Sequence, residues 1–231
     1  MMEPKIISAG KFVKEQLRKW ESMHSEEDKI SEVQIPVITV SGEPGSKGSI
    51  VAEGIASRLE FDLFNRDIIK EIANSVKMSA TVIETLEEER LSGVEDFIAL
   101  LVRDQYLHPD SYLEHLMKVI GTIGKHGRAV IVGRGANFIL PSESKFSVRV
   151  VAPLELRVQN VANMFGVSLE QAKQRVIRRE SRRRAFIRHS FNADVRDPLN
   201  YDLTINTGKL STASAVEAVI GAIIGCQDKN N

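Results

Sequence analysis

The sequence has little cysteine, no excess charge of either sign and no long hydrophobic run. The single cysteine, Cys226, excludes an internal disulfide framework and is too isolated to form a metal site, which fits a reducing compartment. Lysine plus arginine number 31, as do aspartate plus glutamate, so the overall charge favours neither nucleic acid nor an anionic membrane. No apolar stretch approaches the ~20 residues of a membrane span, and the first residues lack the apolar core of a signal peptide. We therefore expect a cytoplasmic protein without membrane contacts.

Several catalytic patterns are also missing. No serine, histidine and aspartate combination and no cysteine and histidine pair suggests nucleophilic catalysis. The histidines at 108, 115, 126 and 189 do not have the spacing of metal ligands. Internal repeats and low-complexity segments are absent as well. The chemistry must therefore be sought in glycine and arginine motifs.

The chain of 231 residues is long enough for one domain, with or without an appendage. We expect residues 1–34 to form an N-terminal helical appendage and a polar linker, and residues 35–231 to form the main domain. Four apolar residues share one face of a helix expected from Ala9 to Met23. These residues are Phe12, Val13, Leu17 and Trp20. That face either packs on the main domain, which is the simpler interpretation, or docks another chain; the protein could also form a homodimer.

Strands and helices alternate along the main domain. Short apolar strands are expected at 37–40, 61–64, 129–132, 145–152 and 201–206, with helical segments between them. The expected helix caps are Ser79, Ser92, Asp110, Ser168 and Ser211, and the expected helix ends are Gly127 and Gly166. This alternation predicts an α/β fold with a parallel sheet of about five strands, flanked by helices. In such sheets ligands bind at the carboxyl ends of the strands.

The first of these strand ends runs into a glycine loop. The strand 37–40 leads into Gly42, Gly45 and Gly48, and an amphipathic helix begins near Ser49. Unpaired amides at a helix start, together with the helix dipole, bind phosphate well. The pattern is close to the phosphate loop G-x-x-x-x-G-K-[ST], but Lys47 precedes Gly48, so the usual order is inverted. The alternative is a glycine-rich turn without a ligand.

The loop predicts a nucleotide site with specific members. The expected cofactor-binding residues are Gly42, Gly45, Ser46, Lys47, Gly48 and Ser49. The Ser49 hydroxyl is also the candidate ligand for Mg²⁺. Lys47 either reaches the phosphates through a reshaped loop or is a solvated lysine, because one position of shift at a helix start turns a side chain by roughly 100°.

A second candidate is the arginine stretch, residues 175–188. It contains Arg175, Arg178, Arg179, Arg182, Arg183, Arg184 and Arg188, against the single acid Glu180. Such concentrated charge repels itself, and a polyanionic ligand would relieve the repulsion. The alternatives are a solvated basic helix and an RNA-binding patch, but only two aromatic residues lie nearby, which argues against nucleic acid. Arg134, between glycines at the end of strand 129–132, would face the same crevice as the glycine loop.

Several longer motifs together resemble the cytidylate kinase-like family, a branch of the P-loop nucleoside monophosphate kinases. The matching segments are Ser41 to Gly48, Val130 to Leu140, Val148 to Arg157, Glu180 to Asp194, Asp197 with Pro198, and Tyr201 to Thr207. The resemblance extends from about Ile35 to Ile224. It implies a three-layer P-loop NTPase-type fold with a helical, arginine-rich lid.

The resemblance also implies an activity: transfer of the γ-phosphoryl group of ATP to CMP or dCMP, with Mg²⁺. The implied catalytic residues are Lys47, Arg183 and Arg188, and the implied substrate-binding residues are Arg134, Arg66 and Asp194. Two positions depart from true cytidylate kinases. Gly48 stands where their loop lysine belongs, and Gly135 stands where they have an aspartate that helps read the cytosine. The rival interpretation is a regulatory nucleotide-binding module without transferase activity.

Overall fold

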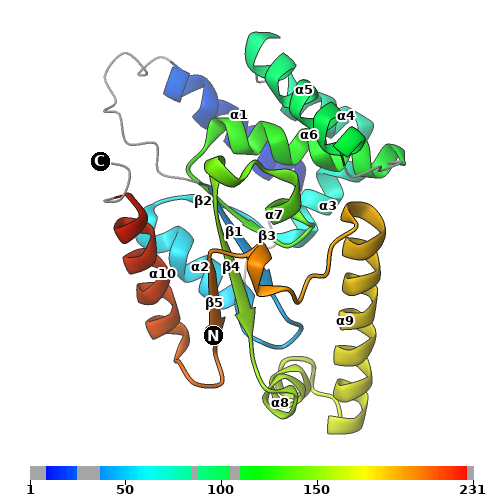
Figure 1. Ribbon diagram of the computed structural model, residues 1–231, viewed down its shortest axis with the longest axis vertical. Coiled ribbons are helices and arrows are strands. Elements are labelled where there is room, and N and C mark those ends of the chain that lie inside the picture. Colours follow the sequence, from blue (N-terminus) through cyan, green and yellow to red (C-terminus); the bar gives the residue numbers. More distant parts are fainter. Residues whose placement is uncertain (1–8, 25–36, 85–87, 105–109, 228–231) are drawn as a thin grey trace. The chain divides into compact units, whose positions relative to one another are not determined.

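A computed structural model describes residues 9–24, 37–84, 88–104 and 110–227. The chain divides into two compact units, one comprising residues 1–35 and 67–127 and the other comprising residues 36–66 and 128–231. The elements of each unit are labelled in Figure 1. The predicted boundary between residues 34 and 35 falls outside the described ranges.

The second unit is built on a five-stranded, all-parallel sheet, as the alternation of strands and helices predicts. Its strand order is β2-β3-β1-β4-β5. The strands are β1 (Val37–Gly42), β2 (Asp62–Phe64), β3 (Ala129–Val132), β4 (Lys145–Val151) and β5 (Leu203–Asn206). β1 lies at the centre, with Ile38 opposite Val130 of β3 and Phe146 of β4. These three side chains are buried, as expected for β-branched and aromatic residues in a parallel sheet.

Two helices of the second unit pack together against this sheet, α2 (Gly48–Leu59) and α10 (Thr212–Gln227). α2 buries Val51 and Ile55, as its apolar periodicity predicts. The two helices approach so closely that a β-carbon on Gly54 would lie 2.6 Å from the Val216 side chain. α2 begins at Gly48, shortly after β1 ends at Gly42, so the glycine loop lies at the carboxyl end of β1.

The chain between β3 and β5 is mainly helical. It forms α7 (Ala136–Ile139), η2 (Ser142–Ser144), α8 (Leu154–Phe165), α9 (Leu169–Phe191) and η3 (Pro198–Asn200). α8 ends at Gly166 in the left-handed conformation, and α9 begins at a capping box formed by Ser168 and Gln171. Both boundaries confirm the predicted ones. The arginine stretch therefore lies on one continuous helix, α9, which packs against α8 (Figure 1).

The described part of the first unit is helical. It contains α1 (Ala9–His24), most of α3 (Arg66–Asn74), α4 (Val76–Ile83), α5 (Glu88–Asp104) and α6 (Ser111–His126). The Trp20 ring of α1 stacks on His126 at the end of α6, with ring centroids 4.0 Å apart. The Trp20 side of α1 therefore packs against α6 of the same chain. α6 starts at Asp110, whose carboxylate accepts a hydrogen bond from the Leu113 amide at 2.8 Å, and ends at Gly127, as predicted.

Two predicted caps are wrong. Ser79 and Ser92 lie inside α4 and α5 rather than at their starts. The cap of α4 is Ser75, whose hydroxyl accepts a hydrogen bond from the Met78 amide at 3.3 Å. Serine suits both a cap and a buried helix interior, where its hydroxyl can bond within the helix. Ser79 is 1% exposed, so tertiary burial places it inside the helix.

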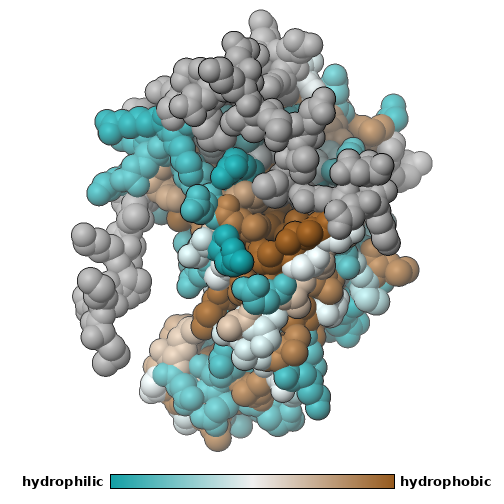
Figure 2. All heavy atoms as spheres, turned by 90° about the vertical axis from the view of Figure 1, so that its left-hand side faces the viewer, coloured by the Kyte–Doolittle hydropathy of each residue, from teal (hydrophilic) through white to brown (hydrophobic). Residues whose placement is uncertain are grey.

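Figure 2 shows hydrophobic surface on the side of the molecule where α10 lies. Ile224 of α10 contributes to the exposed apolar surface, with 54% of its area exposed. Even so, none of the helices described by the structure has both the length and the apolar character that a bilayer span requires.

Candidate functional site

The glycine loop closes tightly between β1 and α2. Gly45 has a φ of 84° and Lys47 a φ of 60°, so the chain turns left-handed twice before the helix. A β-carbon on Gly48 would lie 2.8 Å from the Gly42 Cα, and one on Gly45 would overlap the carbonyl oxygen of Arg157. The three glycines are therefore required by close backbone approach, and a lysine at position 48 does not fit this loop.

The start of α2 presents unsatisfied donors. Its cap is Lys47, which makes no capping hydrogen bond with its side chain. The first amide paired to the loop is that of Val51, which donates to the Lys47 carbonyl at 3.1 Å. The amides of Lys47, Gly48, Ser49 and Ile50 have no acceptor in the described part of the chain. Free amides at a helix start form an anion site.

A buried hydroxyl in the loop supports this assignment. Ser46 is fully buried, and its Oγ has no hydrogen-bond partner among residues 9–24, 37–84, 88–104 and 110–227. This oxygen lies beside the contact of Gly42 and Gly48. An unpaired buried hydroxyl costs free energy, which a ligand that accepts a hydrogen bond from it would recover.

The carbonyl oxygens of the loop, in contrast, are held. Each of four accepts a hydrogen bond from within the same unit. The pairs are Gly42 with Arg183 Nη1 at 2.6 Å, Glu43 with the Ser46 amide at 3.0 Å, Gly45 with Asn160 Nδ2 at 2.8 Å, and Ser46 with Thr207 Oγ1 at 2.8 Å. The loop therefore turns its acceptors into the protein and keeps its donors available.

A buried ion network ties the loop to β4, α8 and α9. The Glu43 carboxylate lies 3.2 Å from Arg149 Nη2 and 3.4 Å from Arg157 Nε. Arg157 also pairs with Glu180 of α9 at 2.9 Å. The exposed fractions of the Glu43, Arg149 and Arg157 side chains are 14%, 6% and 8%, so these charges depend on one another rather than on water.

Arg183 lies against the mouth of the loop. Besides the Gly42 carbonyl, it donates to the Ser41 hydroxyl at 2.6 Å. Both acceptors are neutral, and Arg183 forms no ion pair with any residue that the structure describes. Burial lowers the pKa of Arg183, because removal from water disfavours the charged guanidinium. A partly buried cation without a carboxylate partner attracts an anion to the loop.

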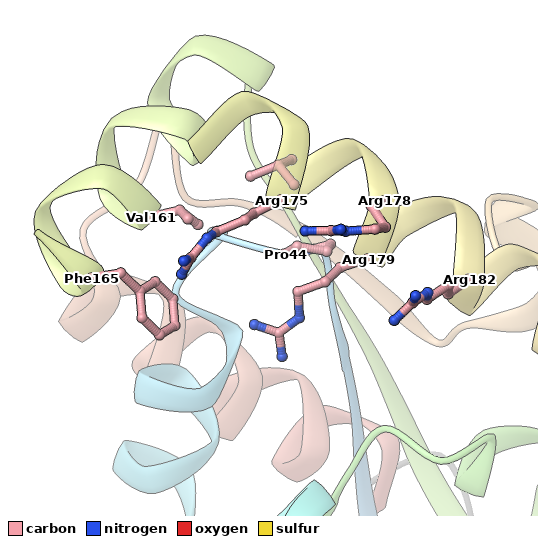
Figure 3. Close-up of a pocket in the computed structure, with 8 residues that line it drawn as sticks. Pro44, Val161, Phe165, Arg175, Arg178, Arg179 and Arg182 are labelled. Atoms are coloured by element: carbon pink, nitrogen blue, oxygen red, sulfur yellow. The ribbon is translucent and has the colours of Figure 1, made fainter. Parts of the chain in front are cut away.

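A hollow of about 260 Å³ adjoins the loop at Pro44. It is lined by Pro44, Val161, Phe165, Arg175, Val176, Arg178, Arg179 and Arg182, as Figure 3 shows. Apolar groups of α8 and α9 form part of its wall, and the Arg175 guanidinium lies 5.3 Å from the centre of the Phe165 ring. Four arginines of the predicted stretch thus gather beside the loop, whereas Arg188 is exposed and is not among the lining residues.

The structure brings two of the three substrate candidates together. Arg134, with a φ of 54°, follows β3, and its Nε donates to the Arg66 carbonyl at 3.2 Å. Asp194 instead pairs with Arg196, with Oδ2 and Nη2 3.2 Å apart on the surface. Hydrogen bonds from Arg196 lower the pKa of Asp194. Lys47 and Ser49 are exposed at the start of α2.

Three residues that hold the loop were not predicted as members of the site. Asn160, Arg157 and Thr207 lie more than 100 residues from the loop in sequence. Thr207 carried a signal because it follows a predicted strand end, and Arg157 because it ends one of the family-like motifs. Asn160 is an ordinary polar residue of an amphipathic helix, so no local pattern reveals its contact.

Comparison with known proteins gives a family. The model of the cytidylate kinase-like family matches residues 37–209. The chain belongs to this family. Among curated relatives, the cytidylate kinase of Pyrococcus horikoshii is 27% identical over 187 residues, which cover 81% of this chain and 88% of that protein. The cytidylate kinase of Methanopyrus kandleri is 26% identical over 205 residues, covering 83% and 96%.

A solved structure shares the fold. An uncharacterized protein from Eubacterium ventriosum superposes with a TM-score of 0.62 at 19% identity, covering 82% of this chain and 98% of that one. The predicted fold class is therefore confirmed by the parallel sheet, the flanking helices and this neighbour.

The structure also explains why this chain has glycine at position 135, where true cytidylate kinases have an aspartate. Gly135 has a φ of 72°, and a β-carbon there would overlap the ring of Phe191 at the end of α9. Phe191 in turn stacks on Phe138, with ring centroids 5.6 Å apart. A side chain such as aspartate therefore has no room at position 135 while α9 packs in this way.

Proposed function

We propose that the protein is an ATP-dependent nucleoside monophosphate kinase that phosphorylates CMP or dCMP. The observation that carries the proposal is the glycine loop beside the partly buried Arg183. Within the described residues, the loop has free amides and an unpaired hydroxyl, and Arg183 has no ion pair with a carboxylate. This combination suits a polyphosphate, and the family and its curated relatives support a kinase. A phosphate oxygen of the acceptor would attack the γ-phosphorus of ATP as the bond to the bridging oxygen breaks, releasing ADP.

The loop would bind the donor. The amides from Lys47 to Ile50 would hold the phosphates of the donor. The turn that positions these amides is formed by Gly42, Gly45, Ser46 and Gly48, which complete the binding site. Mg²⁺, which commonly binds through substrate phosphates, would neutralise charge, and the Ser49 hydroxyl is its protein ligand in this proposal. The exposed position of Ser49 in the first turn of α2 fits that role.

Arginines would supply the remaining positive charge. Arg183 is already beside the loop and would stabilise the transferring group. Arg188 and Lys47 are exposed and would act only after moving toward the phosphates. Arg134 and Arg66 would bind the acceptor phosphate, with Asp194 as a further substrate contact. Only two aromatic residues, Phe186 and Phe191, lie near the arginine stretch, so a small phosphorylated ligand suits it better than RNA. An exposed free Cys226 fits action in the cytoplasm, and a homodimer remains a prediction.

The direct test is turnover. Purified protein with ATP and Mg²⁺ should convert CMP or dCMP to the diphosphate, in preference to AMP, GMP and UMP, measured as ADP formed. If ATP binds but no monophosphate turns over, the kinase proposal fails and the regulatory nucleotide-binding module replaces it.

A variant pair sharpens this test. Arg183→Ala should lower kcat/KM by about 10²–10³-fold, the cost of losing one group that stabilises charge in the transition state. Its control is Arg184→Ala, because Arg184 is the next residue of α9 and is exposed. Equal activity of the two variants would remove Arg183 from the proposed catalytic role.

A further inference from the structure

The free amide of Lys47 depends on how one peptide group is held. We propose that Thr207 is a positioning residue, which fixes the Ser46–Lys47 peptide so that its N–H faces the bound polyphosphate. Asn160 supports it by fixing the preceding peptide. The inference rests on the proposed function, because it takes the donor's phosphates as the ligand of the loop.

The geometry distinguishes this peptide from its neighbours. A peptide group is planar, so holding its oxygen directs its N–H to the opposite side. The Gly45–Ser46 peptide is held at both ends, by Asn160 at the oxygen and by the Glu43 carbonyl at the amide. Among the described residues, the Ser46–Lys47 peptide is held only at its oxygen, by Thr207 Oγ1 at 2.8 Å.

Thr207 is itself rigidly placed. Its amide donates to the Val151 carbonyl at 3.0 Å, and its hydroxyl also lies 3.2 Å from that oxygen. The position it stabilises is a strained one, because Lys47 is left-handed with a φ of 60°. A residue with a β-carbon disfavours that conformation. One hydroxyl, fixed at the end of β5, therefore selects the backbone conformation in which the Lys47 amide is available.

The experiment compares Thr207→Val, which keeps the shape but removes the donor, with Thr207→Ser, which keeps the donor. The control is Thr204→Val, the same change at an exposed position of β5. The probes are inorganic tripolyphosphate and ATP, titrated by calorimetry at 10 °C. Thr207→Val should lower the affinity for tripolyphosphate and for ATP by about tenfold each, the effect of one hydrogen bond. The affinities of Thr207→Ser should stay within about twofold of those of the wild type.

Kinetics separate positioning from a structural role. In Thr207→Val the KM for ATP should rise about tenfold, while the KM for the nucleoside monophosphate stays unchanged. Asn160→Leu should act in the same direction, against the exposed control Asn163→Leu. If Thr207→Val only lowers the thermal midpoint and binds tripolyphosphate as the wild type does, the proposal is overturned.

The binding readout keeps this proposal separate from the kinase proposal. A wild type that binds tripolyphosphate but phosphorylates nothing refutes the kinase, whereas a tenfold loss of binding in Thr207→Val still supports the positioning role. An active wild type whose affinity is unchanged in Thr207→Val refutes the positioning role alone. A wild type that binds neither tripolyphosphate nor ATP overturns both proposals.

Discussion

Glu43 offers a sharp test of how the loop is stabilised. Glu43→Gln keeps the size and shape of the side chain but removes its charge from between Arg149 and Arg157, at 3.2 and 3.4 Å. Removing one partner of a buried ion pair costs about 3–5 kcal/mol, because the other charge stays buried without compensation. Arg157 keeps Glu180, and Arg149 keeps the Val195 carbonyl, so we expect the lower end, about 3 kcal/mol.

Urea denaturation followed by circular dichroism measures this loss. With a slope of about 2 kcal/mol per molar urea, the midpoint should fall by about 1.5 M. The control is Glu53→Gln on the exposed side of α2, which should stay within about 0.5 kcal/mol of the wild type. A loss below about 1 kcal/mol for Glu43→Gln would refute the view that this network holds the loop.

Two further predictions concern other parts of the same unit. Gly45→Ala should destabilise the protein by at least about 3 kcal/mol, since its β-carbon would overlap the Arg157 carbonyl oxygen at a φ of 84°. Gly221→Ala in α10, where a β-carbon meets nothing within 4 Å, should instead stabilise it by about 0.5–1 kcal/mol in the same urea assay, and equal effects would contradict the geometry. Burial lowers the pKa of Lys145 from 10.5 to about 8. Between pH 8 and 10.5 the unfolded chain therefore holds a proton that the folded one releases, so the free energy of unfolding should rise with pH relative to Lys145→Met; a parallel pH dependence of the two proteins would contradict this.

Much of the fold could be predicted because its signals are local. The capping box at Ser168, the left-handed end at Gly166 and the glycine loop after β1 each depend on residues a few positions apart. The caps at Ser79 and Ser92 failed because the same residue type serves at a helix start and inside a helix. Burial of Ser79 against the rest of its unit decided between these uses.

The candidate site likewise has features that local sequence predicts and features that depend on distant contacts. That the loop could bind phosphate followed from its glycines and the helix after it. Arg183, Asn160 and Thr207 bind the carbonyl oxygens of the loop and so leave its amides open. These residues lie 115 to 161 residues from their partners in the sequence. The sequence alone thus determined the strand, the turn and the helix, because neighbouring residues encode them. Only the tertiary structure decided which way each peptide of the loop faces, because hydrogen bonds from distant side chains set that direction.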